Sequence, residues 1–128
     1  MRILMTRWFR RFARKERVGD AALRDAVMRA ERGQIDADLG GGVIKQRVAR
    51  PGRGRSGGYR MILLYRAGTR AIFAFGFAKS RKEDLEADEL EAYRELATVY
   101  LALAERAVDR YVADGILREV TSDEQEEQ

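Results

Sequence analysis

Residues 39–82 contain no aspartate or glutamate, although they carry eleven lysines and arginines. Within this stretch lie three apolar runs typical of β-strands, at residues 43–49, 59–66 and 71–78. A segment rich in glycine and arginine joins the first two runs, and Ala67-Gly68 predicts a hairpin turn between the second and the third. The stretch therefore predicts a small antiparallel sheet that presents cations to a polyanion.

Side-chain alternation along each run predicts what the two faces of this sheet carry. In the first run, Lys45 and Arg47 lie on one face and apolar residues on the other. The second run is apolar on both faces, which indicates a central strand covered on both sides. The third run is expected to place its phenylalanines on one face, in line with Lys79: Phe73, Phe75 and Phe77.

Helical patterns flank the predicted sheet. Trp8 and Phe12, four residues apart, predict a short basic amphipathic helix, and Asp20 is a suitable N-cap for a helix that runs to about Glu31. Whether the basic residues of the first helix bind phosphate is left open, whereas its aromatic rings are expected in the core. The other expected elements are an edge strand at 1–6, a loop at 35–42, a helix from Ser80 or Arg81 to Gly115 with a break near Ala87-Asp88, and a short strand at 116–120.

Charge is distributed very unevenly along the chain. Residues 1–82 carry 21 bases and 6 acids, whereas residues 83–128 carry 4 bases and 15 acids. A basic body predicts a nucleic-acid partner. We expect one domain over residues 1–120, whose part from about 88 onward is a C-terminal helical extension, and a disordered acidic tail at 121–128.

Several functions are disfavoured by what the sequence lacks. There is no cysteine and no histidine, so the commonest zinc ligands and the commonest general base are missing. The acidic residues near 83–91 have no metal-specific spacing, and we expect neither a metal nor a cofactor. No apolar run approaches the length of a membrane span, and the basic N-terminus lacks the apolar core of a signal peptide. We therefore expect a cytoplasmic protein without membrane contact.

The glycine-rich segment between the first two runs resembles a phosphate cradle only in composition. A nucleotide-binding loop needs a lysine followed by serine or threonine and then a helix, but here an apolar strand follows. We expect instead that Arg50, Arg53 and Arg55 contact the phosphate backbone of a nucleic acid. The alternative is a solvated hairpin without a ligand.

Basic side chains in or beside the three runs form the main candidate site. They are Lys45, Arg47, Arg60, Lys79 and Arg81. If the runs are adjacent strands, these cations could converge, and convergent cations stabilise negative charge that grows on a phosphate during a reaction. From charge alone, nucleic-acid binding without chemistry is favoured over catalysis. Tyr59 and Tyr65 could stack on bases, but we prefer core positions for both.

The order of these patterns resembles the RelE/HigB superfamily of bacterial type II toxins. The resemblance covers the architecture of about residues 1–95 and is sharpest over residues 40–85, in GGVIKQRVARPGRGRSGGYR and GFAKSRKEDL. It implies a compact α+β RelE-like fold, with a curved antiparallel sheet, N-terminal helices packed on one face and a C-terminal helical extension. It also implies a metal-independent, ribosome-dependent endoribonuclease that cleaves mRNA, and a cognate antitoxin that is a helix-turn-helix protein.

The resemblance also implies a role for each candidate residue. Lys45 would activate the ribose 2′-hydroxyl for attack on the adjacent phosphodiester, and Arg47 and Arg60 would stabilise the phosphorane charge. Lys79 or Arg81 would assist the leaving 5′-oxygen, and Arg81 would do so electrostatically because arginine is a poor proton donor.

The chain departs from the family pattern in two ways. Some members carry a tyrosine just after the last strand, where this chain has Glu83-Asp84-Leu85, and residues 95–120 extend past the usual end of such toxins. Two other hypotheses therefore stay open: a non-catalytic nucleic-acid-binding or regulatory protein on the same scaffold, and a ParE-like inhibitor of gyrase. The basic sheet and Arg60 speak against the second of these.

Overall fold

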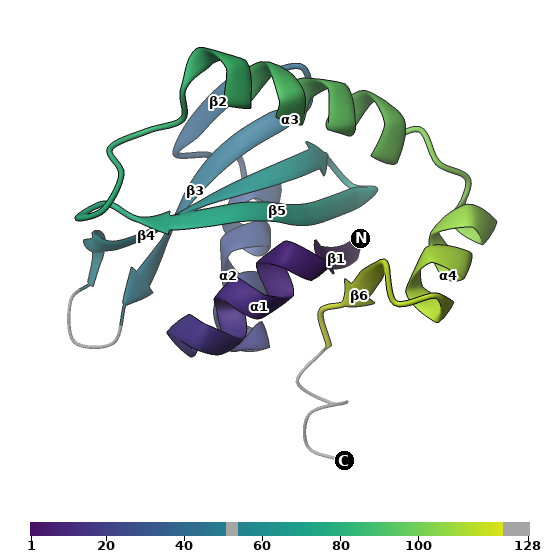
Figure 1. Ribbon diagram of the computed structural model, residues 1–128, viewed down its shortest axis with the longest axis horizontal. Helices are drawn as coiled ribbons and strands as arrows, with labels where there is room; N and C mark the ends of the chain where they lie inside the picture. The colour runs from purple at the N-terminus through teal and green to yellow at the C-terminus, as the bar shows by residue number, and fades with distance from the viewer. Residues whose placement is uncertain (51–53, 122–128) are drawn as a thin grey trace.

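The computed structural model describes residues 1–50 and 54–121 (Figure 1). Its elements are β1 (Arg2–Thr6), α1 (Arg7–Glu16), α2 (Asp20–Glu31), β2 (Ala37–Gly40), β3 (Val43–Arg50), β4 (Gly54–Arg66), β5 (Arg70–Ala78), α3 (Ala87–Tyr100), α4 (Glu105–Ala113) and β6 (Leu117–Glu119). These elements confirm the α+β class predicted from the sequence. Among the described residues, no helix is long and apolar enough to span a bilayer.

The six strands of residues 1–50 and 54–121 form one sheet, in the order β2-β3-β4-β5-β1-β6. Strand β4 lies between β3 and β5 with both faces covered, as predicted for the second apolar run. The predicted antiparallel arrangement is confirmed for β3, β4 and β5, and the sheet is antiparallel throughout except for the neighbours β1 and β5, which are parallel. The prediction of an edge strand at residues 1–6 was wrong, because β6 returns to pair with the outer edge of β1.

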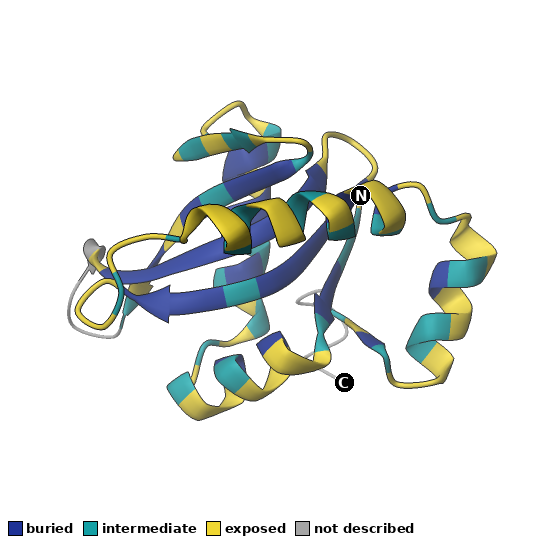
Figure 2. Cartoon of the chain, turned by 45° about the horizontal axis from the view of Figure 1, so that its top comes forward, coloured by how far each residue is buried: buried dark blue, intermediate teal, exposed yellow. Residues whose placement is uncertain are grey.

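Helices cover both faces of the sheet (Figures 1 and 2). Helices α1 and α2 pack on one face, as expected for the N-terminal helices, and α3 and α4 pack on the other. The buried residues of α1, α2 and the first face form one hydrophobic cluster, which includes Phe9, Leu23, Val27, Met61 and Leu63. A second cluster on the opposite face includes Val43, Ile62, Leu64, Ile72, Ala97 and Leu101. Full burial of a valine, leucine, isoleucine, phenylalanine or methionine side chain stabilises the fold by about 1.5–3 kcal/mol.

The N-terminal helices begin and end at recognisable caps. Thr6 accepts a hydrogen bond at Oγ1 from the Phe9 amide at 3.2 Å, and Arg17 ends α1 in the left-handed conformation. Helix α2 is capped by Gly19 without a side-chain bond, so the predicted N-cap role of Asp20 was wrong. The Asp20 carboxylate instead accepts hydrogen bonds from the amide and hydroxyl of Thr121, at 2.9 and 2.8 Å.

Strand β2 lies in the segment predicted as a loop. Leu39 is its only large apolar residue, so the sequence gives no alternating apolar signal there. The following Gly40, Gly41 and Gly42 all have positive φ, which lets β2 turn directly into β3. A Cβ on Gly42 would lie 2.9 Å from Cδ1 of Leu101, so glycine also allows α3 to pack closely over this turn.

A register shift in β5 changes the faces of its phenylalanines. The pairing with β4 is irregular between Ile62 and Leu63. As a result Phe73 packs in the cluster beside α1 and α2, whereas Phe75 and Phe77 pack on the α3 side. The prediction that all three share one face was therefore wrong.

The long C-terminal helix predicted from the sequence is two helices. The segment after β5 forms turns, and α3 begins at Ala87, where the side chains of Glu86 and Glu89 form a capping box. A helix start at Ser80 or Arg81 was thus wrong. A second break at residues 101–104 separates α3 from α4, and the short strand expected after Gly115 is confirmed as β6.

Candidate functional site

Two arginines lie directly opposite each other on neighbouring strands. Arg47 of β3 is paired in register with Arg60 of β4, and Phe77 of β5 is the next residue in the same row. The alternation of β4, with Ile62 in the α3-side cluster, places this row on the α3 face of the sheet. Arg47 is exposed, whereas only 6% of Arg60 is exposed. Like charges opposite each other cost a sheet stability, and the two guanidiniums make this part of the face positively charged.

Lys45 lies on the same face, two residues before Arg47, and is paired in register with Ile62. Its ammonium nitrogen is 3.1 Å from a carboxylate oxygen of Asp84, in the segment between β5 and α3. Burial by itself would raise the pKa of Asp84, but hydrogen bonds from the Leu85 amide and from Lys45 hold that pKa below its ordinary value. Asp84 is therefore an ionised neighbour of the candidate site.

The backbone of Arg47 is fixed by polar groups that the sequence patterns did not reveal. The Asp36 carboxylate accepts a hydrogen bond from the Arg47 amide at 2.7 Å, and the buried Arg29 donates to the Arg47 carbonyl. Gln46, fully buried, donates to the Ala26 carbonyl at 2.9 Å and accepts from the Asp36 amide at 2.7 Å. These bonds tie α2 to the part of β3 that carries the arginine.

The cations that follow β5 are separated into different surroundings. Lys79 and Arg81 are exposed, and Arg81 lines a hollow beside α1 rather than the Arg47–Arg60 row. Lys82 lies 2.9 Å from the Glu89 carboxylate, and this hydrogen bond is the main reason that the pKa of Lys82 is raised. Lys82 thus forms an ion pair with the first turn of α3, whereas Lys79 and Arg81 are exposed and Arg81 lies at the hollow beside α1.

Of the three arginines expected to bind RNA from the hairpin, the structure places the side chain of one. Arg53 and the side chain of Arg55 lie outside the described residues. Arg50 is half-buried, and its guanidinium lies 5.6 Å from the centroid of the Tyr59 ring. Since Tyr59 belongs to the cluster beside α1 and α2, Arg50 lies on the opposite face from the Arg47–Arg60 row.

Tyr59 and Tyr65 are core residues, as preferred from the sequence. The Tyr59 hydroxyl donates to Glu16 at 2.9 Å, and the Tyr65 hydroxyl donates to Glu31. Burial, and then the hydrogen bond to each carboxylate, raises the pKa of Tyr59 and raises that of Tyr65 to about 12. Both phenols therefore stay protonated and inside, where neither can stack on a base.

A different tyrosine reaches the α3 side of the sheet. Tyr93 of α3 stacks on Phe75, with ring centroids 5.9 Å apart and an angle of 29° between the planes. Its pKa is raised, mainly by burial and also by Glu89. From the sequence, Tyr93 lies within the helix expected from Ser80 or Arg81 to Gly115, but its position relative to the sheet depends on where α3 begins.

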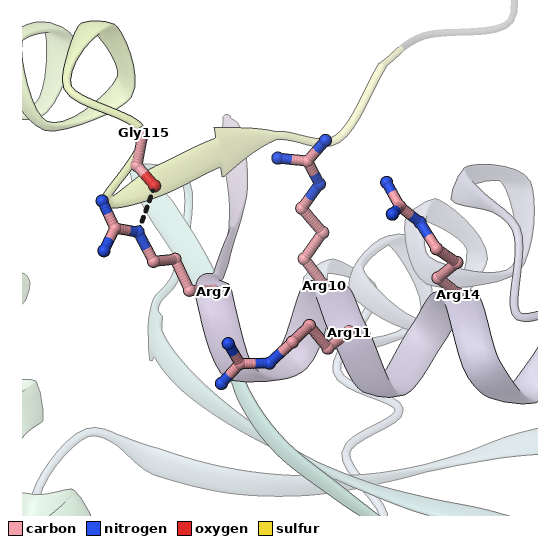
Figure 3. A pocket seen from close by; sticks show the side chains of 5 residues that line it. All are labelled: Arg7, Arg10, Arg11, Arg14 and Gly115. Atoms are coloured by element: carbon pink, nitrogen blue, oxygen red, sulfur yellow. Dashed lines mark hydrogen bonds between the residues drawn. The ribbon is translucent and has the colours of Figure 1, made fainter.

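The outward side of α1 is strongly basic. Its first turn has no acidic residue, and five cations occupy the helix: Arg7, Arg10, Arg11, Arg14 and Lys15. Like charges three or four positions apart and cations near a helix N-terminus both disfavour helix formation. The four arginines and Gly115 line a hollow of about 290 Å³ (Figure 3). Arg7 donates to the Gly115 carbonyl at 2.8 Å, while Arg10, Arg11 and Arg14 make no ion pair within residues 1–50 and 54–121.

Together these features define a small α+β protein that displays cations on both sides of a sheet, as proteins that bind nucleic acid do. The model of one family, the RelE toxin of the RelE / RelB toxin-antitoxin system, matches residues 1–120. The chain belongs to this family, so it is a toxin of a toxin-antitoxin system, and membership implies a cognate antitoxin. Comparisons with curated proteins and with solved structures give no match.

Proposed function

We propose that this toxin is a ribosome-dependent endoribonuclease that cleaves mRNA and stops translation in the cytoplasm. The observation that carries the proposal is the pair of arginines in register on β3 and β4, one of them almost fully buried. Like charges placed opposite each other cost a sheet stability, and departures of this kind from the local rules are expected at functional sites. A phosphodiester bound beside Arg47 and Arg60 would have its charge stabilised by both guanidiniums, and the chemistry needs no metal.

The reaction that suits these groups is attack of a ribose 2′-hydroxyl on the adjacent phosphodiester. The bond from the 2′-oxygen to phosphorus forms while the bond from phosphorus to the 5′-oxygen breaks, which leaves a 2′,3′-cyclic phosphate and a 5′-hydroxyl. Arg47 and Arg60 stabilise the negative charge of the phosphorane. Removing one such preorganised donor typically costs about 100- to 1,000-fold in rate.

Proton transfer is assigned to lysines, because the chain has no histidine. Lys45 lies next to Arg47 on the same face, and we assign it to activation of the 2′-hydroxyl. For this, the 2′-hydroxyl must replace the Asp84 carboxylate as the neighbour of the Lys45 ammonium nitrogen. Lys79 is assigned to protonation of the leaving 5′-oxygen. Arg81 lines a different hollow, so its contribution to the reaction is electrostatic at most.

Expression in cells without the antitoxin tests this proposal. Growth and translation should stop, and mRNA ends mapped in a translating extract should show new cleavage sites. The Arg47→Gln variant should relieve the arrest, whereas Arg106→Gln, which removes an exposed cation from α4, should not. Unimpaired translation with the wild-type protein would overturn the proposal. We further propose that the antitoxin is a helix-turn-helix protein that represses its own operon.

The ion pair between Lys45 and Asp84 favours one alternative, a non-catalytic nucleic-acid-binding protein on the same scaffold. An ionised carboxylate beside the candidate base would then be a permanent partner rather than a displaceable one. This alternative predicts salt-sensitive RNA binding, no cleavage products on programmed ribosomes, and no growth arrest on overexpression.

A further inference from the structure

A second basic hollow lies beside α1, at the end of the sheet where β5 finishes. It has a volume of about 180 Å³. The residues that line it include Trp8, Phe12, Lys15, Glu16, Arg50 and Arg81. Phe77 also lines this hollow and is paired directly opposite Arg60. The hollow is therefore only one strand away from the Arg47–Arg60 row.

The position of α1 explains why a hollow forms there. Strand β1 pairs with β5 only as far as Phe73, and within the described residues no strand pairs with the outer edge of β5 beyond that point. Helix α1 begins directly after β1 and packs along β5. A chain bound at the row on the α3 face can reach α1 around this open edge.

The floor of the hollow is aromatic and held in place. Trp8 is 41% exposed, yet its ring stacks on Phe12, with centroids 5.5 Å apart and planes 12° apart, and contacts Phe75 at 4.5 Å. Phe12 in turn packs edge-on against Tyr59. A Cβ on Gly76 would come within 2.6 Å of the Phe12 ring, so glycine is needed for this ring to lie over β5. These contacts hold the indole in place and leave part of it exposed, and an exposed aromatic ring offers a base a surface for stacking.

Cations from three separate elements surround this floor. Lys15 comes from α1, Arg50 from the end of β3, and Arg81 from the segment after β5. Lys15 and Arg81 make no ion pair within the described parts of the chain. Among the described residues that line the wall, the one acid is Glu16, which accepts the hydrogen bond of the Tyr59 hydroxyl. The hollow is therefore positive around flat aromatic rings.

We propose that this hollow binds one unpaired nucleotide of the RNA that passes the Arg47–Arg60 row. The base stacks on Trp8, and its phosphate is held by Lys15, Arg50 and Arg81. A volume of about 180 Å³ is below that of drug-sized sites and suits a single base. An acidic peptide would use the cations but not the flat rings. The assignment rests on the proposed function, because it places the nucleotide next to the phosphodiester that is cut.

Trp8 is the sole tryptophan of the chain, so it reports on the hollow directly. We would titrate the Arg47→Gln variant, whose hollow is unchanged, with a short single-stranded RNA carrying 2′-O-methyl groups, and record tryptophan fluorescence. Stacking should quench the emission, and an RNA of equal length with abasic residues should bind at least about fivefold more weakly and leave the emission unchanged. Equal quenching by both RNAs would overturn the stacking assignment.

Charge variants test the phosphate contacts and keep Trp8 as the fluorescent group. Arg81→Gln and Lys15→Gln should each weaken RNA binding more than Arg106→Gln, the matched loss of one exposed cation on α4. Circular dichroism confirms that each variant is folded. If all three variants bind alike, the hollow is not the site.

If the wild-type protein cleaves mRNA on ribosomes while Trp8 does not respond to RNA, the hollow proposal fails and the proposed function stands. If Trp8 responds but no mRNA is cut, the proposed function fails and the hollow is a binding site alone.

Discussion

Replacing Arg47 by glutamine should raise stability and abolish toxicity at the same time. Arg47 is exposed and lies opposite a buried arginine, Arg60. A directly opposed cross-strand pair is worth about 0.2–1 kcal/mol, with a destabilising sign for like charges. Glutamine keeps most of the aliphatic stem and removes the repulsion. We therefore expect the free energy of unfolding to increase by about 0.2–1 kcal/mol, which corresponds to about 1–5 °C in Tm for a chain of this size.

Urea denaturation at low and at high salt measures this effect. The gain should shrink as salt rises, because screening weakens the repulsion between the two arginines. Arg118→Gln on β6 is the matched control, since it removes another exposed cation far from the row, and it should change stability by less. A variant that is less stable than wild type, by the same amount at both salt concentrations, would refute the reasoning that the pair is held against its own repulsion.

Three further changes test other parts of the structure. Gln46→Leu should destabilise the fold by about 2–4 kcal/mol in urea denaturation, because it leaves the hydrogen-bonding groups that Gln46 satisfies without their buried partner; a loss below about 1 kcal/mol would contradict this. The hydrogen bond from Tyr65 lowers the pKa of Glu31 in the folded state, so its stabilising effect is present above the unfolded pKa and is lost as pH falls through the folded one. Tyr65→Phe should flatten the loss of stability in acid, and an unchanged pH profile would count against this bond. Asp84→Asn should lower the RNA concentration for half-maximal cleavage by about two- to fivefold, since it frees Lys45 from an exposed ion pair; weaker binding would mean that Asp84 helps to hold the site together.

The sequence predicted the faces of the sheet better than the register of its strands. Alternation alone placed Lys45 and Arg47 together on one side of β3, and the structure agrees. The opposition of Arg47 and Arg60 was not predictable, because the long glycine-rich hairpin between them permits several registers. Arg29 and Gln46 were also missed, since a buried polar side chain leaves no mark in a pattern of apolar residues.

Features that depend on tertiary packing account for the remaining differences. The bulge that separates Phe73 from Phe75 is a property of the β4–β5 pairing and not of either strand. The hollow at Trp8 forms only because α1 lies along an open edge of β5, which follows from the short pairing of β1. The core position predicted for Trp8 was wrong, because 41% of this residue is exposed, and Arg81 was assigned from the sequence only to the catalytic group.

The chemistry itself is tested most directly by a single 2′-substitution in the RNA. Purified ribosomes would be programmed with an mRNA that carries either ribose or 2′-deoxyribose at a mapped cleavage position, and mixed with the wild-type toxin. Attack by the 2′-hydroxyl predicts that the ribose form is cut to a 2′,3′-cyclic phosphate and a 5′-hydroxyl, while the deoxy form stays intact. Cleavage of the deoxy form at the same position would contradict the account.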